Sequence, residues 1–145
     1  MTNFPTAMPI LLECARQETE DLFRIGDALV DETDGSQRTL RKVSAALKAS
    51  GRVGDDMPRW LRGYKASALQ KLFDTSVAFP PDRRRDVSWE LHAEAGNPDF
   101  LDEILAVQKH YPDTFRPIGG MLRFAKEHAK RQRYMERRAR KGENP

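Results

Sequence analysis

Apolar residues recur at helical spacing along almost the whole chain, and no segment alternates apolar and polar residues over the length of a strand. Leu11, Ala15, Leu22, Ile25 and Leu29, for example, are separated by three, four or seven positions. The chain has 145 residues, of which 39% are hydrophobic, so it is long enough to bury one core. We therefore predict an all-α fold in a compact multi-helix domain.

The ends of the expected helices are marked by capping and breaking residues. Ser36 is placed to cap a second helix, Asp55 or Asp56 to cap a third with Pro58 in its first turn, and the proline pair of FPPD ends that third helix. We expect helices at about 8–31, 36–49, 57–72, 87–95, 99–110 and from 117 onward. The short connections favour a single domain over 1–132, with a helix-turn-helix at 36–73, further helices at 86–132 and a basic helix or tail at 133–145.

The charges alternate in blocks along the chain. Residues 1–35 carry a net charge of −6, residues 36–85 of +8, residues 86–115 of −6 and residues 116–145 of +7. Such an asymmetry bears on partners, because basic blocks attract polyanions. Mutual neutralisation of the blocks, within the fold or across a dimer, is the simpler explanation.

No motif for catalysis, metal binding or cofactor binding is recognisable. His92, His110, His128 and Cys14 lack metal-ligand spacing, and Gly119-Gly120 is not part of a phosphate-binding loop. We expect no enzyme activity, no metal and no cofactor. The longest apolar run is too short to span a bilayer, and residues 1–9 lack a positive signal region. One cysteine allows no internal disulfide, which fits a reducing cytoplasmic setting.

The stretch DDMPRWLRGYK, residues 55–65, is the strongest functional signal. It predicts a capped helix with Trp60 and Tyr64 on the inner side and Arg59, Arg62 and Lys65 on the outer side. In helix-turn-helix proteins the second helix offers its N-terminal residues to base edges in the major groove. Arg59, Arg62 and Lys65 are therefore the candidate groove contacts, and the bland alternative is a solvated surface.

Three short stretches resemble helix-turn-helix proteins of actinobacterial plasmids, chromosomes and phages, in a layout related to ParB-type centromere-binding proteins. They are IGDAL at 25–29, WLRGYK at 60–65 and RRRDVSWELHAEAGNPDF at 83–100. The resemblance covers about residues 22–105. It implies a phage- or plasmid-type transcriptional regulator that binds double-stranded DNA and is associated with the nucleoid.

Cations elsewhere in the chain are expected to bind the DNA backbone. The predicted phosphate contacts are Arg38, Arg41, Arg83, Arg84, Arg85, Arg123 and Lys126. The acidic first helix is a candidate surface for a homodimer, since two-fold binders read two half-sites. The basic last helix is either a further contact surface or a solubilising tail. One alternative is a small non-enzymatic phage-type protein that binds and sequesters a host protein; a nuclease or other enzyme ranks third.

Overall fold

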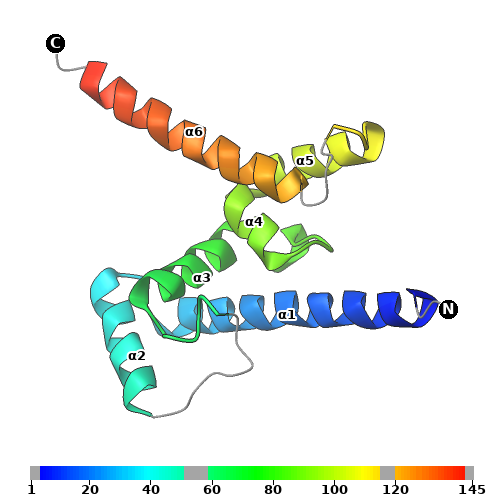
Figure 1. Cartoon of the computed structure of the whole chain (residues 1–145). Helices are drawn as coiled ribbons and strands as arrows, with labels where there is room; N and C mark the ends of the chain where they lie inside the picture. Colours follow the sequence, from blue (N-terminus) through cyan, green and yellow to red (C-terminus); the bar gives the residue numbers. More distant parts are fainter. Residues whose placement is uncertain (1–3, 51–58, 115–119, 143–145) are drawn as a thin grey trace. The chain divides into compact units, whose positions relative to one another are not determined.

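Helices are the main regular structure in the part of the chain that the structure describes. A computed structural model describes residues 4–50, 59–114 and 120–142, with side chains from residue 17 on. These ranges contain six α-helices, one short 3-10 helix and no strand (Figure 1). The elements are α1 (Phe4–Glu32), α2 (Gln37–Ala49), α3 (Ala66–Ala78), η1 (Pro81–Arg83), α4 (Trp89–Ala95), α5 (Pro98–His110) and α6 (Gly120–Gly142). The all-α prediction is confirmed.

Two compact units divide the chain, one over residues 1–89 and one over residues 90–145. Unit 1 contains α1, α2, α3 and η1, and its boundary with unit 2 falls at the first residue of α4. The sequence led us to expect a single domain over 1–132, and that boundary stays a prediction.

Local capping signals explain several helix ends. The Ser36 hydroxyl accepts a hydrogen bond from the Thr39 amide at 3.2 Å and caps α2, as predicted. α3 ends at Ala78, two residues before the proline pair. The Asn97 side chain accepts the Phe100 amide at 2.8 Å and caps α5. The predicted caps Asp55 and Asp56, the proline at position 58 and the helix start near Pro117 lie outside the described residues.

The third helix begins later than the sequence predicts. Residues 59–63 form a turn, and α3 starts only at Ala66, so the predicted helix over 57–72 is wrong in its first part. The Tyr64 amide bonds the Leu61 carbonyl at 2.9 Å, and Tyr64 has a left-handed φ of 52°. A helix cannot continue through a left-handed residue. Leu61 and Tyr64 are nevertheless buried, as the apolar spacing predicted.

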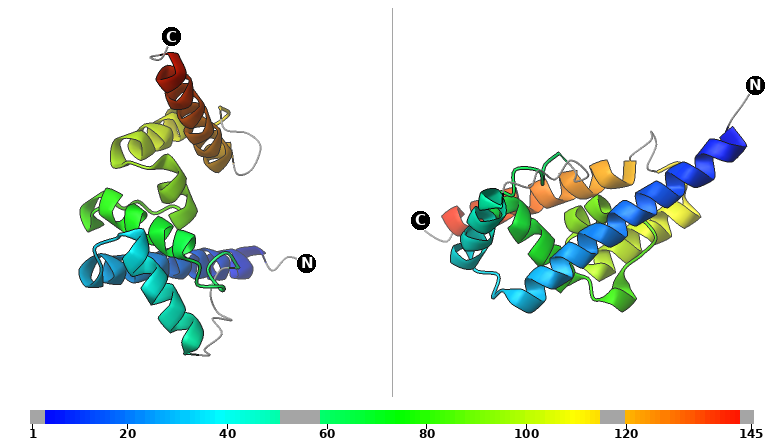
Figure 2. Two further views of the ribbon diagram at one scale, coloured as in Figure 1. Left: turned by 90° about the vertical axis from the view of Figure 1, so that its left-hand side faces the viewer. Right: turned by 90° about the horizontal axis from the view of Figure 1, so that it is seen from below.

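Helix α3 is the centre of unit 1 and contacts both α1 and α2 (Figure 1), while α2 runs steeply away from α1 (Figure 2). Leu72 of α3 and Leu40 of α2 are fully buried. Gly26 lets α1 approach α3 closely, because a Cβ at this position would lie 2.6 Å from the Leu72 carbonyl oxygen. The close packing of α1 against α3 therefore requires a glycine at position 26.

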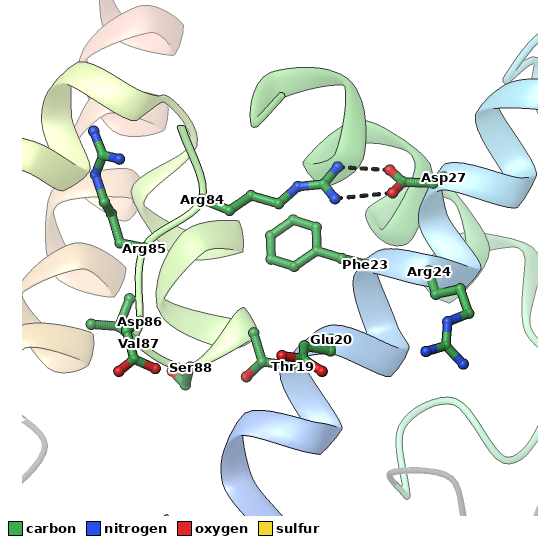
Figure 3. A pocket seen from close by; sticks show the side chains of 10 residues that line it. All are labelled: Thr19, Glu20, Phe23, Arg24, Asp27, Arg84, Arg85, Asp86, Val87 and Ser88. Carbon is green, nitrogen blue, oxygen red and sulfur yellow. Dashed lines mark hydrogen bonds and ion pairs between the residues drawn. The ribbon is translucent and has the colours of Figure 1, made fainter. Parts of the chain in front are cut away.

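An ion pair joins α1 to the segment that follows α3 (Figure 3). The Arg84 guanidinium donates to both carboxylate oxygens of Asp27, at 2.7 and 2.9 Å. Its Nε donates to the Phe79 carbonyl at 2.8 Å, and its central carbon lies 4.2 Å from the centre of the Phe23 ring. These hydrogen bonds from Arg84 lower the pKa of Asp27 below its usual value. Further along, the Trp89 amide donates to Thr19 Oγ1 at 3.1 Å.

Unit 2 consists of most of α4 with α5 and α6. Leu101 and Ile104 of α5 are buried, and Ala125 of α6 is fully buried. Phe100 of α5 contacts His128 of α6, with ring centroids 4.3 Å apart. Only the first half of α6 takes part in this packing, since every residue from 130 to 142 is exposed.

Replacing Gly26 by alanine should destabilise unit 1. In an open helix this change would stabilise by about 1 kcal/mol, but here the added methyl group meets the α3 backbone. We expect the free energy of unfolding to fall by about 1–3 kcal/mol, measured by chemical denaturation. Gly63→Ala is the control, because its Cβ would meet only Lys65 Cγ at 3.9 Å. Equal stability of the two variants would contradict the close approach.

The ion pair predicts a pH-dependent effect of Asp27→Asn. Because the folded-state pKa of Asp27 is depressed, its contribution is present above the unfolded pKa of about 3.9 and is lost as the pH falls through the folded value. At pH 7 we expect a loss of about 1–2 kcal/mol, a figure moderated by the 44% exposure of the Asp27 side chain. The difference from wild type should shrink below about pH 4.

Asp21→Asn is the matched control on the same helix. Asp21 lies 3.7 Å from Arg24, whose side chain is 77% exposed. Such a surface pair contributes only a few tenths of a kcal/mol. Denaturant titrations of both variants at pH 7 and pH 3 separate the two cases, and a pH-independent effect of Asp27→Asn would refute the linkage.

Candidate nucleic-acid interface

Exposed cations gather on two acid-free segments of unit 1. Residues 36–50 and 59–73 contain no aspartate or glutamate. We define the α2–α3 basic surface as six of the eight exposed cations of these segments, leaving out Lys42 and Lys71; the six are Arg38, Arg41, Lys48, Arg59, Arg62 and Lys65. The first three lie on α2, and the others lie on the turn and at the N-terminal end of α3. No acid of these two segments neutralises them.

A buried hydrogen bond holds the turn against α2. The Ser44 hydroxyl of α2 donates to the Tyr64 carbonyl, and both side chains are buried. Arg41 and Lys48 lie three residues before and four residues after Ser44, so they flank this contact on the same helix face. Lys65 follows Tyr64 directly. The contact therefore brings the cations of α2 and those of the turn into one neighbourhood.

The N-terminus of α3 lacks the groups that usually stabilise a helix start. Its N-cap is Lys65, no side chain caps it, and its first turn contains no acid. A helix N-terminus carries partial positive charge and is stabilised by anions. Arg62 and Lys65 add further positive charge near this end. Helices usually have acidic residues there and basic residues at the C-terminus.

Trp60 is the one large exposed apolar residue in the turn. Its side chain is 41% exposed and stacks on Trp89, with ring centroids 5.2 Å apart and planes at 13°. Lys71 Nζ lies 5.9 Å from the Trp60 ring centre and 5.8 Å from that of Trp89. We expected Trp60 to pack the third helix onto the core. Instead it packs the turn onto Trp89 and leaves part of its ring in solvent.

The three arginines at 83–85, predicted as phosphate contacts, differ in their surroundings. Arg84 is committed to Asp27 and Phe79, and its side chain is only 17% exposed, so we assign it a structural role. Arg83 and Arg85 are half-buried, and Arg85 donates to the Asp82 carbonyl at 3.3 Å. Arg84 and Arg85 line a groove of about 860 Å³ between α1 and residues 84–88 (Figure 3). Both acids and cations line this groove.

The two predicted phosphate contacts in unit 2 lie on α6. Arg123 and Lys126 are both exposed. Lys126 Nζ lies 3.1 Å from a carboxylate oxygen of Glu90, so part of its charge is neutralised within the unit. These residues belong to unit 2 and are not part of the α2–α3 basic surface.

Sequence reasoning missed the partners that position the turn. Trp89 and Lys71 contact Trp60 from 29 and 11 residues away, and no local pattern links them. Lys48 lies on α2, and only the contact between Ser44 and Tyr64 relates it to the turn. Among the described residues, no three His, Cys, Asp or Glu side chains are grouped so as to hold a metal ion.

Comparisons with protein-family models, with characterised proteins and with solved structures found no match to this chain. Within the described ranges, each helix is too short or too polar to cross a membrane.

The half-exposed stack predicts a moderate effect of Trp60→Ala on stability. The change removes the stacking on Trp89, and we expect a loss of about 1–2 kcal/mol in the free energy of unfolding. Trp89→Ala should cost more, about 3–5 kcal/mol, because Trp89 is only 3% exposed. Thermal melts followed by circular dichroism measure both. A larger loss for Trp60 than for Trp89 would contradict the stacking geometry.

Proposed function

We propose that the protein binds double-stranded DNA through the α2–α3 basic surface. The single observation that carries the proposal is the start of α3, whose N-cap is Lys65, whose first turn contains no acid, and which no side chain of the described residues caps. Arg59 and Arg62 lie in the turn that leads into it. Cations at this end raise the free energy of the isolated protein. A phosphate placed there would relieve the repulsion and be stabilised by the positive end of the helix dipole.

The arrangement of the cations suits a DNA backbone. Arg38, Arg41 and Lys48 are long, exposed side chains on α2, and such groups position a protein on phosphates. Arg59 and Arg62, on the turn, would reach toward the groove, where arginine can bond guanine with two hydrogen bonds. The turn replaces the first part of the helix that we predicted, so these arginines would contact DNA from a loop rather than from a helix.

The resemblance of residues 25–29, 60–65 and 83–100 to helix-turn-helix proteins supports a regulatory role. In that class, α2 and α3 would be the helix pair and the protein would control transcription from a phage, plasmid or chromosome. A homodimer would then bind two half-sites. Sedimentation analysis with and without DNA tests this part separately.

A second candidate function is the binding of an acidic protein partner. The observation that favours it is Trp60, because tryptophan next to arginine is enriched at protein interfaces. In that case the same cations would meet carboxylates instead of phosphates. The two functions differ in whether duplex DNA alone is bound.

A salt titration tests DNA binding directly. If the α2–α3 basic surface neutralises about five phosphates, it should contribute about −4 to −5 to the slope of the log–log dependence of affinity on salt. Fluorescence polarisation with a labelled random duplex, from ~50 mM salt upward, measures this slope. The absence of binding at ~50 mM would reject the proposal and favour the protein partner.

Arginine variants test the location of the contact. Arg59→Ala and Arg62→Ala should each weaken binding to a preferred site by about 1–3 kcal/mol and weaken binding to random DNA much less. Arg24→Ala, on the exposed side of α1, removes the same charge from another surface of unit 1 and should have little effect. Equal behaviour of all three variants would show that the turn is not the contact.

A further inference from the structure

The basic residues of α6 are sorted to one side of the helix. At 100° per residue, all nine fall within about half of the circumference. We call them the α6 basic face: Arg123, Lys126, Lys130, Arg131, Arg133, Arg137, Arg138, Arg140 and Lys141. With the two acids Glu127 and Glu136, the net charge of the helix is +7. Random scatter of nine cations would occupy all sides of the helix.

The opposite side of α6 is the side that packs in unit 2. Phe124 and His128 lie near Phe100 of α5, at 6.1 and 4.3 Å between ring centroids, and Ala125 is fully buried. These residues fall in the half of the helix that lacks cations. Lys126, at the edge of the α6 basic face, pairs with Glu90 of α4. The rest of the face points away from the core of its own unit.

The outer half of α6 has no packing to explain its charge pattern. All residues from 130 to 142 are exposed, and this end extends past α5 in Figure 1. Lys130, Arg133, Arg137 and Arg140 follow one another at intervals of three, four and three residues, a mean rise of about 5 Å along the helix axis. Like charges at such spacing destabilise a helix by about 0.2–0.5 kcal/mol per pair. A polyanion along this row would remove that repulsion.

We propose that the α6 basic face is a second DNA-contact surface, which binds the phosphates of a duplex without reading its sequence. The choice of DNA rests on the proposed function; the surface itself does not involve the α2–α3 basic surface. An α-helix fits the major groove, which is about 12 Å wide, and long side chains at this spacing reach the phosphates that border it. The exposed stretch of 13 residues is about 20 Å long.

The composition of the other side argues against a membrane as the occupant. Helices that lie on membranes need a continuous apolar face opposite their cations. Beyond residue 129 the side without cations carries Gln132, Met135, Glu136 and Ala139. A single methionine between two polar residues would bury little apolar area in a bilayer, whereas phosphate binding requires no apolar face.

The test compares two double variants with the same change of charge on opposite sides of the exposed half. Arg133→Gln/Arg137→Gln removes two charges from the α6 basic face, and Gln132→Glu/Ala139→Glu adds two negative charges on the other side. All four positions are exposed, so folding should be kept, as circular dichroism checks. Binding of the full chain to a random duplex and to vesicles of equal parts phosphatidylcholine and phosphatidylserine is measured at several salt concentrations.

We expect the Arg133→Gln/Arg137→Gln variant to bind the duplex roughly tenfold more weakly near 100 mM salt, with a salt slope less steep by about 1.8. The Gln132→Glu/Ala139→Glu variant should keep the wild-type slope. Equal loss in both variants would mean that only net charge matters and would overturn the proposal. Face-specific loss on vesicles but not on the duplex would overturn it in favour of a lipid surface.

Failure of this inference and failure of the proposed function are distinguishable. If wild type binds duplex DNA and loses affinity with Arg59→Ala and Arg62→Ala but not with Arg133→Gln/Arg137→Gln, only the α6 surface is rejected. If the reverse holds, the α6 basic face is the contact and the α2–α3 surface is rejected. Absence of duplex binding by wild type rejects both.

Discussion

The ion pair between Arg84 and Asp27 is the interaction on which the geometry of unit 1 depends. It fixes the segment after α3 along α1, and the hydrogen bond from the Trp89 amide to Thr19 fixes the end of that segment. Trp89 in turn supplies the surface on which Trp60 stacks. Because each contact supports the next, the ion pair helps to position the turn that carries Arg59 and Arg62.

The helices were predictable where the signal is local. Ser36 caps α2 and the proline pair follows α3, because both effects act within a few residues. The start of α3 was not predictable in the same way. Leu61 and Tyr64 are three residues apart, and one turn buries such a pair as well as a helix does. The left-handed backbone at Tyr64 follows from tertiary packing, which no short-range propensity encodes.

In the candidate site, too, the local features were predictable from the sequence and the long-range contacts were not. Exposure of Arg59, Arg62 and Lys65 followed from their polar character and spacing, and the structure agrees. The role of Arg84 did not follow, since its partner Asp27 lies 57 residues earlier and the sequence offers three adjacent arginines without distinguishing them. Only the pairing with Asp27, 57 residues away, distinguishes Arg84 from its two neighbours as a structural residue.

The stack of Trp60 on Trp89 also determines what the protein's intrinsic fluorescence can report. These are the chain's two tryptophans, and both belong to unit 1. Their fluorescence emission follows the loss of the stack and hence the unfolding of unit 1. It does not report on α5 and α6, which contain no tryptophan. The far-ultraviolet signal, in contrast, sums the helices of both units. If the fluorescence and far-ultraviolet melting curves coincide, the two units unfold as one cooperative body; if they differ, the units unfold in succession.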